Sequence, residues 1–237
     1  DEVAHSGSTG GYSTYLARYP GKALSIAVLC NVAGAPATQL TRSLVDALVP
    51  DLAPVAAADT VAGDPAAAAK LAGIYRSLRT HEPLVIGTNT GRGGRGGAIR
   101  ALAGGAWLIG NNRAVFETSP DGSPKGVRVV GADNDTTAYV FAATGPWNPT
   151  PEQLAAFAGR YRSDEVAATW TVKVENGRLA ATIRGAVRAE FTPVYLDAFS
   201  AGAGLGTVWF TRDAKGAVTA MHSGSARVWD FVFTREK

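Results

Sequence analysis

Cysteine and histidine are scarce in this sequence, and their scarcity excludes several kinds of site. A single cysteine, Cys30, excludes a disulfide framework and a zinc site built from cysteines. The three histidines, His5, His81 and His222, lie far apart along the chain, so a histidine metal cluster is not expected. We therefore expect no cofactor and no resident metal.

Long apolar runs and runs of basic residues are also missing. No apolar stretch approaches the roughly 18 residues that a membrane span requires, so no membrane span is expected. The net charge is only +3 and no run of Lys or Arg occurs, which argues against nucleic acid as a partner. The 46% of hydrophobic residues indicates a folded protein with a real core, and 237 residues suffice for one or two domains.

Two segments of the chain repeat one pattern. Asp64-Pro65 and Thr150-Pro151 each place a capping residue before a proline, which is typical of a helix start. A short Ala-rich stretch follows each start, and the short helix predicted there ends in the motif Ala-Gly-x-Tyr-Arg-Ser, at Ser77 and at Ser163. The expected organisation is residues 1–49, a Pro/Ala-rich linker over 50–63, and two similar β domains over 64–145 and 146–237.

Both repeats are predicted to be small antiparallel β barrels or strongly curved sheets, so the fold class is mainly β. Residues 170–175 alternate apolar and polar side chains, and Asn176-Gly177 is a strong hairpin signal. The Gly-rich segment 87–97 lacks the GK[ST] of a phosphate loop and is predicted to be a hairpin loop. Further strands are expected over 178–184, 208–212, 218–223 and 228–234, and in the first repeat over 99–102, 107–109, 114–118, 127–130 and 137–141. Four tryptophans on these strands are expected in barrel cores: Trp107, Trp170, Trp209 and Trp229.

Residues 1–49 have a different pattern. Three antiparallel strands are predicted over 3–8, 12–19 and 23–31, and the apolar run of the third is typical of a central strand covered on both faces. A helix is predicted over 36–48, and its core-facing stripe is expected to be Leu40, Leu44, Ala47 and Leu48.

The segment His5-Ser6-Gly7-Ser8 carries the most chemical information. It is predicted to be a strand that enters a Gly-rich turn, where a substrate can lie against bare backbone and a main-chain N–H can donate to an oxyanion. Residues 5–20, followed by 24–31 and a helix, resemble the last part of the catalytic domain of serine β-lactamase-like hydrolases. That family includes class C β-lactamases, family VIII esterases and DD-peptidases, and the two repeats resemble the lipocalin-like β domains appended to many of its members.

The resemblance implies specific roles. His5-Ser6-Gly7 matches the family's third box, His-x-Gly or Lys-Thr-Gly, on the strand that walls the active site. The backbone N–H of Ser8 would then serve in the oxyanion hole, and we expect Tyr12 and Asn31 to contact the substrate. The implied reaction is hydrolysis of a small ester or amide through an acyl-enzyme, and the family implies a bacterial periplasmic or extracellular location.

The sequence departs from the family at the nucleophile. No serine is followed by lysine three residues later, so the Ser-x-x-Lys box is absent from this chain. The two formal matches to the second box, Tyr75-Arg-Ser77 and Tyr161-Arg-Ser163, lie downstream of the third box, in the wrong order. The chain starts at Asp1 with no initiator Met, and we expect it to begin inside a longer precursor. His5 in place of lysine favours esterase or peptidase ancestry.

Three functions therefore stay open. The first is the C-terminal part of a serine hydrolase, completed by an N-terminal polypeptide or a swapped homodimer that covers the otherwise unpaired strand edge. The second is a non-catalytic binding or oligomerisation module, in which the barrels bind an apolar ligand or a partner and residues 1–49 serve as an oligomerisation segment. The third is a promiscuous hydrolase that uses His5 or a bound metal.

Overall fold

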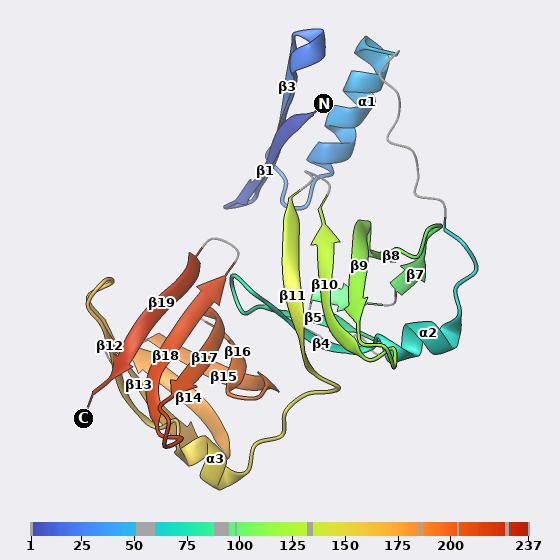
Figure 1. The fold of residues 1–237 in the computed structure, drawn as a ribbon. Helices are drawn as coiled ribbons and strands as arrows, with labels where there is room; N and C mark the ends of the chain where they lie inside the picture. Colours follow the sequence, from blue (N-terminus) through green and yellow to red (C-terminus); the bar gives the residue numbers. More distant parts are fainter. Residues whose placement is uncertain are drawn as a thin grey trace. The chain divides into compact units, whose positions relative to one another are not determined.

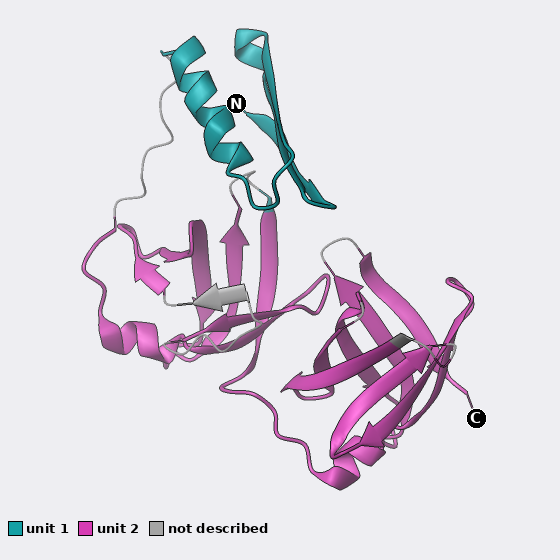
Figure 2. Cartoon of the chain, turned by 180° about the vertical axis from the view of Figure 1, so that it is seen from behind, with its two compact units in different colours: residues 1–59, 132–135 teal, residues 60–131, 136–237 magenta. Residues whose placement is uncertain are grey.

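A computed structural model of the chain describes residues 2–50, 60–87, 95–97, 99–131, 135–183, 185, 187–202, 204–225 and 228–236. The protein is mainly β, as expected. It divides into two compact units, which Figure 2 distinguishes by colour. Unit 1 consists of residues 1–59 with 132–135, and unit 2 of residues 60–131 with 136–237.

Unit 1 is a three-stranded antiparallel sheet with one helix along it (Figure 1). Its elements are β1 (Val3–Thr9), β2 (Tyr12–Tyr19), the 3-10 turn η1 (Pro20–Lys22), β3 (Leu24–Cys30) and α1 (Ala37–Leu48). The order β1-β2-β3 leaves β1 and β3 as edges within this sheet. These bounds agree with the predicted ones to within one residue.

The face of α1 that packs on the sheet was predicted wrongly. The helix buries Ala37, Thr41 and Val45, and Val45 joins Ala17 and Tyr19 in the core of unit 1. The leucines at 40, 44 and 48 are exposed, by 46%, 46% and 63%. Two stripes of residues spaced four apart compete on this helix, and the smaller side chains allow closer approach to the sheet.

The third strand, β3, also differs from its prediction. It is an edge strand in unit 1, and its side chains alternate between half-buried and exposed. Leu29, for example, is 78% exposed. The apolar run is therefore covered by α1 on one face only in this chain.

In the described part of the chain, the first repeat is an eight-stranded sheet that does not close. It begins with α2 (Pro65–Lys70), capped by the Asp64 carboxylate, which accepts the Ala66 N–H at 2.8 Å. The strands are β4 (Gly73–Ser77), β5 (Pro83–Ile86), β6 (Arg95–Gly97), β7 (Ile99–Ala101), β8 (Trp107–Ile109), β9 (Asn112–Thr118), β10 (Pro124–Val130) and β11 (Thr136–Ala143). Their order is β6-β5-β4-β11-β10-β9-β8-β7, so the sheet is open between β6 and β7. Most of segment 87–97, predicted to be a hairpin loop, lies outside the described residues.

The second repeat is a closed eight-stranded barrel, in which β12 pairs with both β13 and β19. It begins with α3 (Pro151–Ala155), whose capping box joins Thr150 and Gln153. Its strands are β12 (Gly159–Ser163), β13 (Ala168–Glu175), β14 (Arg178–Ile183), β15 (Val187–Tyr195), β16 (Ala198–Ala201), β17 (Gly206–Arg212), β18 (Val218–Ser225) and β19 (Val228–Arg235).

The predicted repeat has a structural counterpart in each sheet. The Tyr75 hydroxyl donates to the Leu71 carbonyl at 2.6 Å, and the Tyr161 hydroxyl donates to the Phe157 carbonyl at 2.7 Å. Both tyrosines are completely buried. The shared Gly-x-Tyr-Arg-Ser motif forms strands β4 and β12 rather than helix ends. Gly73 has a φ of +150°, and a Cβ there would lie 2.8 Å from the Ala143 carbonyl oxygen, so the strand begins where a side chain does not fit.

The closed barrel is filled by its own side chains. Its core cluster contains the aromatic residues Phe157, Tyr161, Trp170, Phe191, Phe199, Phe210 and Phe233. Phe199 makes edge contacts with Phe157 and Phe210 at centroid distances of 5.4 and 5.8 Å. Of the four tryptophans expected in barrel cores, Trp170 is in this core and Trp107 packs against the core of the first repeat. Trp209 is buried in a separate cluster, and Trp229 is 57% exposed, so these two predictions were wrong.

Candidate functional site

The predicted site residues lie on β1 and at the adjoining end of unit 1. Strand pairing places His5 opposite Leu16, Gly7 opposite Thr14 and Thr9 opposite Tyr12. Because side chains alternate along a strand, His5 and Tyr12 share the face of the sheet that α1 does not cover. Ser6 and Ser8 are on the other face, opposite Tyr15 and Ser13. In the segment His5-Ser6-Gly7-Ser8, every residue except Gly7 is exposed.

The Gly7 backbone lies close to the Thr14 side chain on the neighbouring strand β2. A Cβ at this position would lie 2.5 Å from the Thr14 Oγ1 atom. The Thr14 hydroxyl instead donates to the Gly7 carbonyl at 3.4 Å. The glycine of the box therefore keeps this part of the exposed face flat and open.

The main-chain groups of Ser8 point to the free edge of the sheet. Gly10 and Gly11 have φ values of +53° and +93°, which are typical of a two-residue type I′ hairpin. In such a hairpin the closing pair, here Thr9 and Tyr12, exchanges both hydrogen bonds, and hydrogen-bonded pairs then alternate with non-hydrogen-bonded ones. The Ser8–Ser13 pair is consequently a non-hydrogen-bonded pair, and the Ser8 N–H faces away from β2.

The two expected substrate contacts lie at the same end of the sheet as Ser8. Tyr12 opens β2 and is 57% exposed. Asn31 is exposed and follows β3 directly, one residue after Cys30, which pairs with Ser13. Ser8, Tyr12 and Asn31 are thus contributed by three neighbouring strands or their ends.

The opposite end of β1 is fixed by a tyrosine–carboxylate contact. The Tyr15 hydroxyl donates to Glu2 Oε1 at 2.8 Å. Partial burial raises the pKa of Tyr15 above its ordinary value, and the hydrogen bond to Glu2 adds to the shift. Tyr15 is therefore neutral at any physiological pH and holds the start of β1 in place.

The structure does not bring a second histidine into unit 1, because His81 and His222 belong to unit 2. Among the residues that the structure describes, no three His, Cys, Asp or Glu side chains gather closely enough to hold a metal ion.

A polar cluster on the outside of the barrel was missed in the sequence. The Asp230 carboxylate lies 2.8 Å from His222 Nδ1, and the Thr211 hydroxyl lies 3.3 Å from His222 Nε2. Asp230 accepts from Nδ1, so Nε2 of the neutral ring accepts from Thr211. The three residues come from β17, β18 and β19, and only the register of these strands, not the sequence spacing, brings them together.

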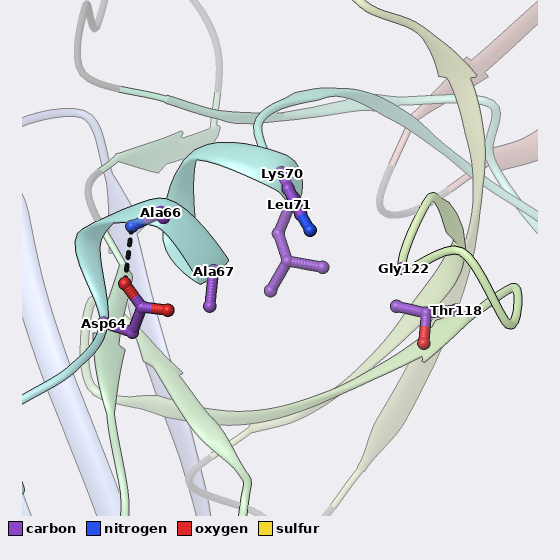
Figure 3. A pocket seen from close by; sticks show the side chains of 7 residues that line it. All are labelled: Asp64, Ala66, Ala67, Lys70, Leu71, Thr118 and Gly122. Atoms are coloured by element: carbon purple, nitrogen blue, oxygen red, sulfur yellow. Dashed lines mark hydrogen bonds between the residues drawn. The ribbon is translucent and has the colours of Figure 1, made fainter.

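Unit 2 also carries an open pocket of about 330 Å³ (Figure 3). Its lining residues are Asp64, Ala66, Ala67, Lys70, Leu71, Thr118 and Gly122. Figure 3 shows the Asp64 carboxylate turned back to the Ala66 N–H, so this group is already used to cap α2. The pocket therefore offers the Lys70 ammonium and the Thr118 hydroxyl, on exposed side chains, as its remaining polar groups.

Comparisons with known proteins give little further evidence. No protein-family model matches the sequence, and no curated protein matches it. Among solved structures, the chain is similar to the crystal structure of SurE with D-Leu, at 17% identity and a TM-score of 0.31. That match covers 99% of this chain and 35% of the other, so the chain spans about a third of that protein's length. A likeness this weak carries no argument. In the described part of the chain, no helix has the length and hydropathy needed to cross a membrane.

Proposed function

We propose that unit 1 is one wall of the active site of a serine hydrolase that cleaves an ester or amide through an acyl-enzyme. A second polypeptide segment, carrying the Ser-x-x-Lys nucleophile, completes the site. The observation that supports this proposal best is the Ser8 N–H, which points to a free, polar strand edge beside His5 and Gly7. In this reading the N–H donates to the oxyanion that forms when the serine attacks the substrate carbonyl.

The exposed apolar surface of unit 1 supports the need for a second segment. Val3, Leu16 and Leu29 are exposed on the uncovered sheet face, by 64%, 54% and 78%. Leu40, Leu44 and Leu48 are exposed on a flank of α1, beside the stripe that packs on the sheet. Contiguous exposed apolar side chains mark surfaces that another protein segment covers. A sheet covered on both faces would also account for the apolar run of β3.

The two edges of the sheet suit different tasks. The β3 edge carries Leu24, Ile26 and Val28, which favours pairing with an added strand. The β1 edge carries histidine, serine and glycine, which favours contact with a polar substrate. We therefore place the added segment on β3 and the two apolar faces, and the substrate along β1.

The second possible function, binding of an apolar ligand inside a barrel, is less well supported. Phe157, Phe199 and Phe210 occupy the centre of the closed barrel and contact one another. A ligand would have to displace these fully buried rings. The same barrel can still serve as a surface for a protein partner.

Substitution of Ser8 by proline tests the proposal. Proline removes the backbone N–H, and on an edge strand this change breaks no ladder hydrogen bond when the N–H faces outward. Protein with a C-terminal tag is purified from its native source and treated with a fluorophosphonate probe. The intact masses of its polypeptides are then measured by mass spectrometry. We expect a probe adduct on a segment with Ser-x-x-Lys, and about a 100- to 1000-fold loss of ester hydrolysis in Ser8→Pro.

The matched control is Ser8→Ala, which removes the hydroxyl but keeps the N–H, and a loss of less than tenfold is expected for it. Equal losses in the two variants would show that the N–H is not the oxyanion donor. An unlabelled sample that contains only the 24.5 kDa chain would contradict the proposal as a whole.

A further inference from the structure

The two β repeats of unit 2 meet through a buried joint. Ile74 of the first repeat forms one apolar cluster with Tyr195, Ala198 and Trp209 of the barrel. The turn between β4 and β5 fits closely against the barrel at Gly224, where a Cβ would lie 2.6 Å from the Thr80 carbonyl oxygen. The turn can therefore change its position only if it moves away from the barrel.

His81 is the centre of this joint. Its imidazole stacks on the Trp209 indole with ring centroids 3.9 Å apart and an interplanar angle of 7°. The Tyr195 hydroxyl donates to the His81 carbonyl at 2.7 Å. His81 has a φ of +59°, an unfavourable conformation for a residue with a side chain, so contacts with the barrel help to hold it in this position.

The surroundings of the imidazole are arranged for a neutral ring. One guanidinium nitrogen of Arg76 lies 3.3 Å from Nδ1 and 3.2 Å from Nε2 of the ring. The guanidinium is always charged and can only donate. A proton on His81 would place a second positive charge directly beside Arg76.

The other groups around His81 come from three elements, namely β18, β19 and the turn itself. His222 of β18 also stacks on Trp209, at 5.2 Å, and Asp230 of β19 accepts from His222. Arg79 of the same turn lies over the Trp229 ring of β19, and Glu82 of the turn accepts from the Thr80 hydroxyl. Burial, Arg76 and His222 disfavour the imidazolium, whereas Asp230 favours it, and the pKa of His81 is lowered to about 4.

We propose that the joint between the two β repeats is an acid-operated latch, closed while the His81 imidazole is neutral and opened by its protonation. In the open state the ring reaches water, so the proton binds there without the cost of burial. The two sheets stay folded, because their cores lie on either side of the joint and do not include His81.

The size of the effect follows from linkage between protonation and opening. A pKa of about 4 in the closed joint and at most its ordinary value of 6.5 in the open one raise the ratio of open to closed molecules by up to about 30-fold at pH 5, relative to pH 8. Above pH 7.5 the ratio is constant, because His81 is neutral in both states. Opening increases as pH falls from 6.5 toward 4.

Distances between two spin labels test the latch in the full chain. The labels are attached at Val115→Cys on β9 and Lys173→Cys on β13, both exposed positions, with Cys30→Ser as background. We expect one distance population at pH 7.5 and a second, longer one that grows between pH 6 and pH 4. The far-UV circular dichroism spectrum should stay unchanged over this range.

Two variants distinguish the effect of His81 from that of the nearby His222. His81→Asn is neutral and tolerates the left-handed backbone, so the longer population should change less than threefold between pH 7.5 and pH 4. His222→Asn is the matched control and should keep the response of the parent chain. If His81→Asn is open at every pH, the His81 Hε1 resonance of the parent chain is titrated by NMR instead. The latch requires a His81 pKa below 5 that matches the midpoint of opening.

The latch is overturned by a constant distance from pH 7.5 to pH 4, by an equal response in His81→Asn and the parent, or by a His81 pKa near 6.5. Loss of the far-UV signal at the same midpoint as the change in distance would also overturn it, since acid unfolding would then explain both.

Discussion

At the scale of single residues, each β repeat contains the same kind of buried hydrogen bond, from a tyrosine hydroxyl to a main-chain carbonyl. Tyr161 links β12 to the segment that follows α3, because its hydroxyl donates to the Phe157 carbonyl at 2.7 Å. Tyr75 makes the equivalent bond to Leu71. Both carbonyls lie just after a short helix, where intrahelical partners run out. The Tyr-Arg-Ser motif therefore repeats because each repeat needs the same partner for the end of its first helix.

Removal of the Tyr161 hydroxyl should lower the free energy of unfolding of the barrel. Tyr161→Phe leaves the buried Phe157 carbonyl without this donor, and we expect a loss of about 1–2 kcal/mol in urea unfolding at pH 7. Burial raises the pKa of Tyr161 to about 12 from an ordinary 10, so the parent chain loses stability as pH rises above 10. The deficit of the variant should shrink there, by at most about 1.4 kcal/mol per pH unit. Tyr75→Phe is the control for the first repeat, and a deficit that does not change between pH 9 and pH 11 would contradict the assigned burial effect.

At the scale of elements, local sequence signals predicted where strands and helices begin and end better than they predicted which of their faces are buried. The bounds of β2 and α1 follow from alternation, from the Pro20-Gly21 turn and from the helix periodicity, which are all local. The covered face of α1 and the one-sided cover of β3 are not local, since they depend on what else packs there. Periodicity identifies an apolar stripe but cannot tell which of two stripes meets the sheet.

The candidate site divides in the same way. The positions of His5, Gly7 and Ser8 on one strand were predictable from a short segment, and the hairpin at Gly10 and Gly11 fixes which main-chain groups face outward. The joint at His81 and the Asp230–His222–Thr211 cluster were not predictable. Their members come from strands whose register depends on closure of the whole barrel.

The two stripes of α1 should respond differently to truncation. Val45→Ala removes buried methyl groups from the core of unit 1 and should lower its free energy of unfolding by about 1–2 kcal/mol. Leu44→Ala truncates a side chain that is 46% exposed and should change it by less than about 0.5 kcal/mol. Denaturant unfolding followed by backbone amide NMR of residues in β2 measures both. A larger cost for Leu44→Ala than for Val45→Ala would mean that the leucine stripe is the covered one.

At the scale of the whole molecule, closure distinguishes the two repeats. β12 pairs with β19 and completes the barrel, whereas the first sheet is open between β6 and β7. The sequence between β5 and β7 is rich in glycine and lacks the large apolar side chains that a barrel interior needs. Sequence similarity at the start of each repeat therefore predicted a shared unit but not whether the unit closes.

The two units should differ in their ability to fold alone. Unit 2 contains the large clusters around Phe199 and Tyr75, and residues 60–237 expressed separately should melt within about 2 °C of the barrel transition of the full chain. The core of unit 1 consists of Ala17, Tyr19 and Val45 with a few half-buried neighbours, and domains of about 50 residues are marginal even with a complete core. A peptide of residues 1–49 should therefore show little β or helical signal by circular dichroism at 25 °C. A cooperatively folded, monomeric peptide would show that the exposed leucines need no cover, and it would remove the main structural reason for a second segment.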